Sequence, residues 1–369
     1  PIILGGPHAT AQPREVLGRD CFDYVVLGEG EEALSKLVKC IGEKNGFSRI
    51  DGIAYKRNGQ VVVQPKSSFI KDIDSLPFPS YHLLSLNEYP EAPHGTFYKK
   101  RPFVSMFTSR GCPYRCTYCA NPTMWGHSWR ARSHEKIVAE MSYLIEKFGI
   151  REIHFEDDNF TLSRNRVVKI CQTMLENNID IAWKCPNGIR VEQLDLDTIQ
   201  LMRRAGCYSL SFGIESGVQE ILDKVNKRLD LNKVRRVVSW AKEAGIFTVG
   251  FFIFGLPGDA PDTIKRTIRY AKSLDLDAAQ FNVFVPFPGT ELFDLYDREG
   301  YIKTYDWSKY NVDHLVFETE DIRADDIFNL RKEAFKQFYL RPKIILSNLR
   351  QVSSLNNLSW LIRRVQRVL

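Results

Sequence analysis

The chain has 369 residues, of which 44% are apolar and 26% charged, a composition typical of a globular protein of about two to three domains. Its longest apolar run, residues 247–256, is much shorter than the ~20 residues that a membrane-spanning helix needs. The net charge of +6 equals the charge of residues 341–369 alone, which contain six Lys and Arg and no Asp or Glu. Because the rest of the chain is near neutral, the net charge does not indicate that the part of the chain before residue 341 binds nucleic acid.

Eight cysteines in a chain of this length do not form a disulfide framework. Three of them are crowded between residues 112 and 119. The other five are scattered along the chain: Cys21, Cys40, Cys171, Cys185 and Cys207. Scattered thiols suit a reducing cytosol, so we expect a cytoplasmic protein.

The first 33 residues predict a strand, a short helix and a second strand, and each strand runs into a glycine-rich turn, as in an open α/β sheet. Residues 50–64 predict a β-hairpin, because two strand-like runs flank Asn58-Gly59, a pair that tolerates the positive φ angles of a tight turn. Pro77 and Pro79 then indicate a linker.

From residue 103 onward, strand-like runs alternate with segments of helical period. The strand-like runs are VSMFTS, REIHFE, DIAWK, YSLSFGI, FTVGFFIFG and AQFNVFV. The segments between them carry apolar residues at spacings of three and four, and several end at glycine, as at Gly149, Gly206 and Gly245. Six β/α units predict an α/β fold in which a parallel sheet curls into a partial (β/α)6 barrel.

The strand pattern stops after about residue 295, and residues 324–340 and 355–369 predict helices. The second of these helices has an apolar stripe beside the basic residues of the tail. Such a helix can lie on an anionic membrane surface, which would make the protein peripheral to the inner face of the membrane. The alternative is that the stripe packs on the barrel while the arginines face water.

Cys112, Cys116 and Cys119 lie in the segment SRGCPYRCTYCANP, just after the first strand of the repeat and therefore in a loop at the carboxyl face, where barrel enzymes place their chemistry. Structural zinc sites usually take a fourth ligand from a second C-x-x-C pair, but no such pair follows and His127 is poorly spaced. Soft thiolates suit a 4Fe–4S cluster, and three of them leave one iron open to a substrate or cofactor. A zinc loop or three buried thiols are the alternatives.

The CxxxCxxC motif, with Tyr118 before its third cysteine and a β/α repeat around it, resembles the radical S-adenosylmethionine (SAM) superfamily. The resemblance implies that the open iron chelates the amino and carboxylate groups of SAM. An electron from the cluster would then break a sulfonium–carbon bond to give methionine and a 5′-deoxyadenosyl radical. Tyr118 would lie against the adenine.

The ends of the other strands are polar or glycine-rich, as a SAM site requires. By resemblance, Asp157 and Asp158 stand where the superfamily has its amino-group motif, often written GGE. This sequence departs from that wording, so either carboxylate is a candidate for the ammonium, and Asp158 could instead be a helix N-cap. Glu215 matches the position that reaches the ribose or the methionine part. Three further positions are expected near SAM: Ile253, Gly255 and Pro286.

Three other residues have two interpretations each. Arg190 could pair with the SAM carboxylate or simply bridge to acidic side chains at the surface. Cys185 could touch the substrate, although a buried core thiol is the commoner role of such a residue. His8 is more typical of a turn neighbour than of a metal ligand.

Residues 1–33 resemble the last third of the cobalamin-binding domain that precedes many radical SAM cores, with Gly5-Gly6 as the pair where backbone approaches the cobalamin tail. The histidine and Ser-x-Leu motifs of that domain belong upstream of the pair and are not in this sequence, so we expect cobalamin to bind only in a longer, full-length protein. The expected parts are a domain remnant (1–33), a hairpin and linker (34–100), the radical SAM core (101–295) and a helical C-terminal region (296–369).

The favoured function is cobalamin-dependent C-methylation driven by reductive cleavage of SAM, with radical cyclisation or rearrangement as the alternative within the superfamily. A different class would be an iron–sulfur or zinc module that binds nucleic acid through the basic tail. Nucleic-acid-binding segments often place aromatic side chains among their basic residues, but Trp360 is the only aromatic residue in this part of the sequence. No nucleic acid is therefore expected. The expected partners are a small-molecule or lipid-like substrate and an electron donor such as flavodoxin or ferredoxin.

Overall fold

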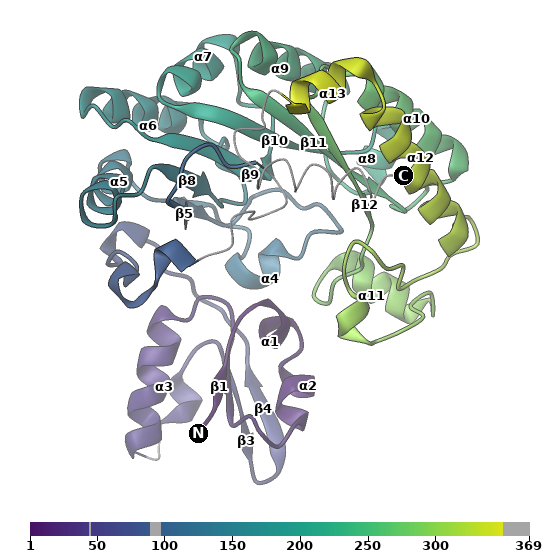
Figure 1. The fold of residues 1–369 in the computed structure, drawn as a ribbon. Coiled ribbons are helices and arrows are strands. Elements are labelled where there is room, and N and C mark those ends of the chain that lie inside the picture. The colour runs from purple at the N-terminus through teal and green to yellow at the C-terminus, as the bar shows by residue number, and fades with distance from the viewer. Residues whose placement is uncertain (44–45, 89–96, 350–369) are drawn as a thin grey trace. The chain divides into compact units, whose positions relative to one another are not determined.

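The computed structural model describes residues 1–43, 46–88 and 97–349. The described chain forms two compact units (Figure 1). Unit 1 comprises residues 1–73, 110–130 and 286–302; unit 2 comprises residues 74–109, 131–285 and the described residues from 303 onward. The helix predicted at 355–369, and with it the membrane-surface interpretation of the tail, lies outside the described residues.

A four-stranded sheet in the order β1-β2-β3-β4 forms the centre of unit 1. Its strands are β1 (Ile3–Leu4), β2 (Tyr24–Val26), β3 (Ile53–Arg57) and β4 (Gln60–Gln64). The first two are parallel, and the others pair antiparallel. Asn58 and Gly59, between β3 and β4, have φ angles of 52° and 77°, as a two-residue hairpin turn requires. The predicted hairpin is confirmed, and its first strand pairs with β2.

Helices cover both faces of this sheet because side chains alternate along its strands. Val25 packs in one apolar cluster with residues of α1 (Pro7–Ala11) and α2 (Pro13–Gly18), whereas the next residue, Val26, packs in another with residues of α3 (Glu31–Glu43). The other α-helices among the described residues of the unit are α4 (Asn121–Trp125) and α11 (Glu291–Arg298).

Unit 2 is built on a six-stranded parallel sheet in the order β12-β11-β10-β9-β8-β5. Its strands are β5 (Phe103–Met106), β8 (Glu152–Phe155), β9 (Ala182–Ile189), β10 (Cys207–Glu215), β11 (Phe247–Phe254) and β12 (Ala278–Val283). Each predicted strand-like run overlaps one of these strands. The predicted α/β fold with a partial, six-stranded barrel is therefore confirmed.

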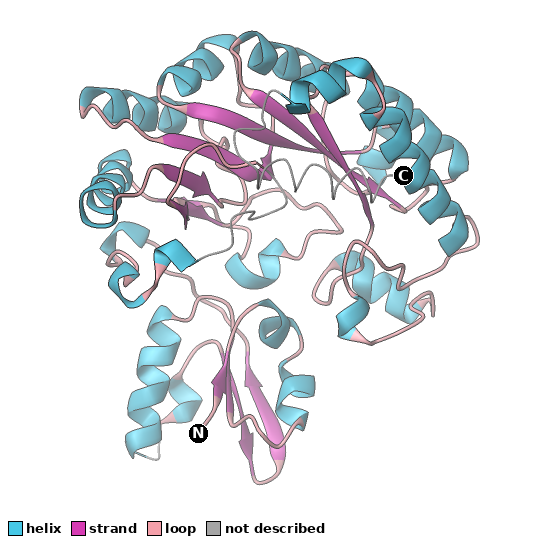
Figure 2. Ribbon diagram, in the orientation of Figure 1, coloured by secondary structure: helices cyan, strands magenta, loops and turns pink. Residues whose placement is uncertain are grey.

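Helices line one face of this sheet (Figure 2). They are α5 (His134–Phe148), α6 (Arg164–Glu176), α7 (Leu196–Arg204), α9 (Leu231–Glu243), α10 (Pro261–Ser273) and α12 (Ala324–Tyr339). Phe252 and Phe254 both contact the ring of Phe281, which in turn packs against Phe335 and Phe338 of α12. Phe251 and Ile253, which alternate with Phe252 and Phe254, lie on the opposite face of the sheet and are only half-buried.

The predicted helices of the repeat and the predicted helix at 324–340 are confirmed. Two further helices of unit 2, α8 (Gln219–Lys224) and α13 (Pro342–Leu349), were not predicted, because so short an apolar pattern has no clear period. None of the described helices is long and apolar enough to cross a membrane.

Candidate active site

Four neighbouring strands bring polar or glycine residues to the carboxyl edge of the six-stranded sheet. Asp157 and Asp158 follow β8, Arg190 follows β9, Glu215 ends β10 and Gly255 follows β11. Parallel strands all end at the same edge, and ligands of open α/β sheets bind there. Five of the predicted SAM-site residues are thus placed along one edge of unit 2.

Asp157 is buried, and its carboxylate accepts three hydrogen bonds from the chain that follows β5. The backbone N–H of Thr108 donates to Oδ1 (2.6 Å), while the hydroxyls of Thr108 and Ser109 donate to Oδ2 (both 2.5 Å). Arg166 of α6 donates to the carbonyl oxygen of Thr108 (2.8 Å). Asp157 therefore fixes the two residues that lead into the cysteine loop.

Glu215 ends β10 in a left-handed conformation (φ 67°), which non-glycine residues seldom adopt. The register with β11 shifts between Gly213 and Glu215, which marks a bulge. Oε1 of Glu215 lies 2.8 Å from Nζ of Lys227, and both side chains are nearly buried. A Cβ on Gly213 would lie 2.9 Å from the same carboxylate oxygen, so glycine leaves room for the ion pair. Backbone strain of this kind concentrates at functional sites.

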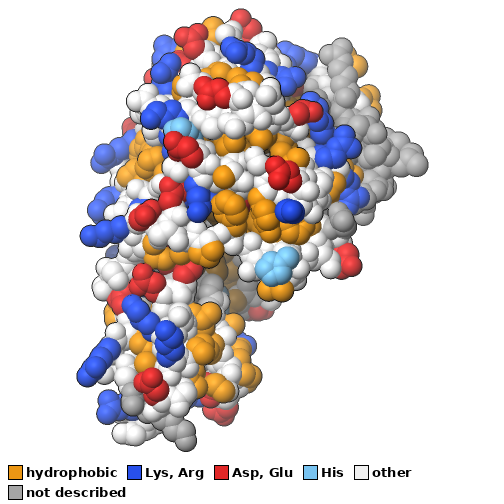
Figure 3. All heavy atoms as spheres, turned by 90° about the vertical axis from the view of Figure 1, so that its left-hand side faces the viewer, with side chains coloured by type: hydrophobic (Ala, Val, Ile, Leu, Met, Phe, Trp, Pro, Cys, Tyr) orange, Lys and Arg blue, Asp and Glu red, His pale blue; other side chains and the backbone are white. Residues whose placement is uncertain are grey.

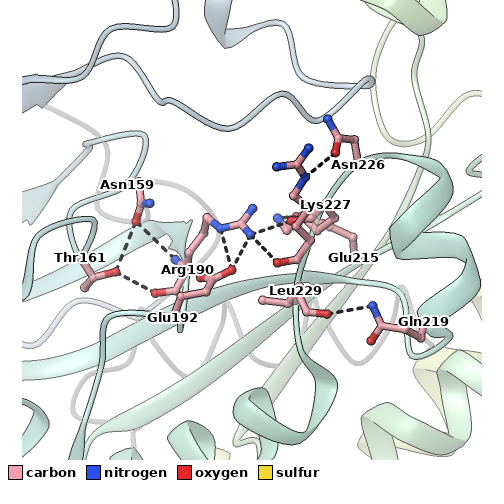
Figure 4. A network of polar contacts seen from close by, with 10 residues as sticks. Asn159, Thr161, Arg190, Glu192, Glu215, Gln219, Asn226, Lys227 and Leu229 are labelled. Carbon is pink, nitrogen blue, oxygen red and sulfur yellow. Dashed lines mark hydrogen bonds and ion pairs between the residues drawn. The ribbon is translucent and has the colours of Figure 1, made fainter.

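Arg190 joins the ends of β8 and β9 to the segment after α8 (Figure 4). Its Nη2 donates to the carbonyl oxygen of Lys227 (2.6 Å), its Nε donates to Oε1 of Glu192 (3.0 Å), and its carbonyl oxygen accepts from the hydroxyl of Thr161 (2.8 Å). The guanidinium pairs with an acidic side chain, Glu192, and the pairing of Arg190 with the SAM carboxylate stays a prediction. The guanidinium also fixes the backbone that carries the partner of Glu215.

The end of β11 is shaped by a buried acid that sequence analysis did not single out. Gly255 has a φ of 95° and donates its N–H to Oδ2 of Asp259 (3.0 Å), which also accepts the N–H of Leu256 (3.2 Å). Burial raises the pKa of Asp259 to about 6. The hydrogen bonds from Gly255 and Leu256 lower this pKa, but the effect of burial is larger. The neighbouring Ile253 is half-buried, as is Asp158 after β8.

A buried polar cluster on β8, β9 and β10 was also missed. Glu152 accepts the hydroxyl of Tyr208 (2.5 Å), and its Oε1 lies 2.7 Å from Nε2 of His154. Nζ of Lys184 donates to the carbonyl oxygen of Phe97 (2.9 Å), and burial lowers the pKa of Lys184 to about 8. The available signal was the alternation of charged and apolar residues in REIHFE, which places Glu152 and His154 on the same face of β8.

The three clustered cysteines belong to unit 1. Cys112, Cys116 and Cys119 are all half-buried, and the N–H of Cys119 donates to the carbonyl oxygen of Cys116 (3.1 Å) in a tight turn. The short strands β6 (Ser109–Arg110) and β7 (Arg130–Ala131) pair and close the stem of this loop, residues 111–129.

A second segment of unit 1 supports the cysteine loop. The N–H of Leu292, in α11, donates to the carbonyl oxygen of Thr117 (3.2 Å), and the hydroxyl of Thr123 donates to the carbonyl oxygen of Gly289 (3.1 Å). Tyr118 is half-buried in the loop. Pro286, at the start of the supporting segment, is buried.

Among the described residues, no three His, Cys, Asp or Glu side chains converge as the ligands of one metal ion would. A four-iron cube binds its three thiolates through three different irons, so it does not require that convergence. Three half-buried thiols within eight residues are a donor set of the right softness for such a cube.

The other residues singled out from the sequence have simple surroundings. Gly6 has a φ of 100° and directly precedes α1, while Gly5 is exposed. Nε2 of His8 lies 2.9 Å from Oε2 of Glu15 at the surface, as expected of a turn neighbour. Cys185 is buried in the apolar core of unit 2, so the core interpretation holds, and burial raises its pKa well above the usual value.

In barrel enzymes the segments that follow the strands carry the active site, and here the segment after the first strand of the partial barrel carries three cysteines. Residues 106–271 match the radical SAM superfamily. Over 350 residues the chain is 34% identical to PH0819 of Pyrococcus horikoshii, an uncharacterized methyltransferase, and the match covers 94% of this chain and 74% of that protein. The chain belongs to the radical SAM superfamily.

Two other comparisons extend over most of the chain. An anaerobic magnesium-protoporphyrin IX monomethyl ester cyclase of Cereibacter sphaeroides is 27% identical, over 93% of this chain and 55% of the cyclase. The structure of the radical SAM methyltransferase TsrM from Kitasatospora setae, with cobalamin and a 4Fe–4S cluster bound, has a TM-score of 0.65 at 21% identity, over 83% of this chain and 59% of TsrM. That likeness supports the fold. The chain thus spans little more than half the length of these two proteins.

Proposed function

We propose that this chain binds a 4Fe–4S cluster through Cys112, Cys116 and Cys119 and cleaves SAM reductively to start radical chemistry on a small molecule. The observation that carries the proposal is the loop of three half-buried thiols that continues directly from Thr108 and Ser109, which Asp157 anchors. When bound, the cluster supplies the electron for cleavage, and an electron donor such as flavodoxin or ferredoxin would supply it to the cluster.

The carboxyl edge of unit 2 would bind SAM. SAM carries a cationic sulfonium and ammonium, and the carboxylates of Asp158 and Glu215 are suitable partners for such groups. Asp157 is committed to Thr108 and Ser109, so we assign it a positioning role and assign the ammonium to Asp158. Gly255, whose N–H is held by Asp259, would present the backbone of β11 to the adenine together with Ile253. By the resemblance, Tyr118 and Pro286 of unit 1 are further candidates for contact with SAM.

C-methylation is the reaction favoured for the whole protein, because the relative from Pyrococcus horikoshii that covers most of this chain is a methyltransferase. Gly5-Gly6 would then lie at the backbone that approaches cobalamin. Radical cyclisation is the second candidate, because the relative from Cereibacter sphaeroides is a cyclase. The cleavage of SAM is the same in both reactions, and only the fate of the substrate radical differs.

A nucleic-acid-binding module has less support. On the face shown in Figure 3, the lysine and arginine side chains are interspersed with aspartate and glutamate, so that face is not a uniformly basic surface.

The test of the proposal is anaerobic reconstitution followed by incubation with SAM and a strong reductant. We expect a broad iron–sulfur absorption and formation of 5′-deoxyadenosine and methionine, measured by mass spectrometry. A fully reconstituted protein that binds SAM but forms neither product would contradict the proposal. With a substrate in hand, SAM labelled with deuterium in its methyl group separates the two reactions, because methylation adds the label and cyclisation removes hydrogen without adding it.

A further inference from the structure

Glu29 is a buried carboxylate in the turn between β2 and α3, and its side chain is 1% exposed. Oε1 lies 3.2 Å from Nη1 of Arg110 and also accepts a hydrogen bond from Nη1 of Arg130. Oε2 accepts the backbone N–H of Ile70 (2.8 Å). A carboxylate this deeply enclosed is stable only because each oxygen has charged or N–H partners.

The two arginines are the two ends of the cysteine loop. Arg110 is the residue immediately before the loop, which begins at Gly111 and continues with Cys112. Arg130 is the residue immediately after the loop, which ends at residue 129. One carboxylate from the N-terminal part of unit 1 therefore holds both ends of the 111–129 segment.

Both arginines also reach into the loop that they close. The Arg110 guanidinium lies 5.0 Å from the ring centre of Trp125, and its Nη2 lies 2.5 Å from Oε1 of Glu31. Arg130 donates to the carbonyl oxygens of Trp125 (3.0 Å) and Ser128 (3.3 Å). Loss of Glu29 would therefore disturb the interior of the loop as well as its stem.

The backbones at the base of the loop are in close contact. A Cβ on Gly111, which has a φ of 81°, would lie 2.4 Å from the carbonyl oxygen of Ser128. A Cβ on Gly28, next to Glu29, would lie 3.0 Å from the carbonyl oxygen of Met124. Glycine at these positions lets the Glu29 turn and the loop approach closely.

We propose that Glu29 is the positioning residue of the cysteine loop: it sets the conformation of residues 111–129 before any cluster is bound. The proposal rests on the proposed function in one respect, namely that this loop is where the cluster binds. A cofactor site needs ligands that are held in place by a supporting set of contacts, and a site whose support is loosened binds its cofactor less well. Glu29 supplies that support through charge, since an uncharged side chain of the same shape leaves the buried guanidinium of Arg130 and the half-buried guanidinium of Arg110 without their shared counter-ion.

Hydrogen–deuterium exchange of the apo protein, resolved by peptide, tests this without a cluster. In Glu29→Gln, we expect amides of residues 111–129 to exchange about tenfold faster or more, while strands β8 to β12 keep wild-type protection. Arg110→Met provides a second variant that removes one of the two partners, and it should raise exchange in the same peptides. Asp51→Asn is the matched control, because Asp51 is another well-bonded carboxylate of unit 1, but its partners are Ser67, Ser68 and Lys66, and none of them belongs to the cysteine loop.

Reconstitution gives the second readout. Iron bound per chain should fall in Glu29→Gln but not in Asp51→Asn, and the EPR spectrum of whatever reduced cluster forms should change in Glu29→Gln. Unchanged loop exchange together with wild-type iron content in Glu29→Gln would overturn the proposal, as would an equal loss of loop protection in Asp51→Asn. Wild-type protein that takes up no iron would instead count against the proposed function, because the exchange result is obtained without iron.

Discussion

Oε1 of Glu215 lies 2.8 Å from Nζ of Lys227, and both side chains are nearly buried. Removing one partner of a buried ion pair leaves the other charge enclosed without its counter-charge, at a cost of about 3–5 kcal/mol, whereas replacing both by apolar groups costs little. Glu215 therefore has a structural role that must be separated from any role in binding SAM.

We expect Glu215→Ala to lower the free energy of unfolding by about 3–5 kcal/mol in urea denaturation and to weaken SAM binding. The double variant Glu215→Ala, Lys227→Met should recover most of the stability but not the SAM affinity, measured by equilibrium dialysis on reconstituted protein. Recovery of both properties in the double variant would show that Glu215 acts on SAM only through the fold.

Asp157 and Asp158 are adjacent in the chain but are expected to respond differently. Asp157→Asn weakens hydrogen bonds to Thr108 and Ser109 that are each worth roughly 1.5–3 kcal/mol when the acceptor is charged, so its melting temperature should fall. Asp158→Asn should lose about tenfold or more in SAM affinity. If Asp158→Asn binds SAM as the wild type does, the ammonium assignment is wrong.

The cysteine assignment has a control within the same chain. Cys112→Ala, Cys116→Ala and Cys119→Ala should each bind well below the ~4 irons per chain of the wild type and form no 5′-deoxyadenosine. Cys207→Ala should keep the cluster, because Cys207 is buried in the apolar core of unit 2. Retained SAM cleavage in Cys112→Ala, with loss in Cys207→Ala, would overturn the ligand set.

The parts of the fold that were predicted correctly are those with a local signal. The strand of EIHF and the helix of EKIVAEMSYLIEKF each follow from a period that any short window reveals. The cysteine motif is equally local. The partners of Asp157 have no local signal, because Thr108 and Ser109 lie 49 and 48 residues away. Nothing in the sequence shows that these two residues donate hydrogen bonds to both oxygens of the Asp157 carboxylate.

The same reason explains why Glu29 was missed as a site residue. In the sequence it is one acid in a glycine-rich turn, and its arginine partners lie 81 and 101 residues later. Only the folded chain shows that both partners flank one loop. Glu215 was identified by the resemblance, from its place at the end of a strand, but its partner Lys227, 12 residues on, was not.

Lys184 should make the stability of the protein depend on pH in the alkaline range. Burial lowers its pKa from 10.5 to about 8, although Glu152 and Glu156 nearby act in the opposite direction. Between these two pH values the unfolded chain binds more protons than the folded chain, so folding becomes more favourable as pH rises. The buried ammonium group of Lys184 therefore lowers the free energy of unfolding fully below pH ~8, and this destabilisation declines between pH ~8 and pH ~10.5.

The comparison with Lys184→Met isolates this contribution from the other titrating groups. Between pH 7.5 and 9.5 we expect the free energy of unfolding of the wild type, relative to that of Lys184→Met, to rise by about 2 kcal/mol in urea denaturation. Lys36→Met, which removes an exposed lysine of α3, should show no such change with pH. If the difference between the wild type and Lys184→Met is flat over this range, Lys184 titrates in the folded protein as it does in water, and the burial of its ammonium group does not perturb it.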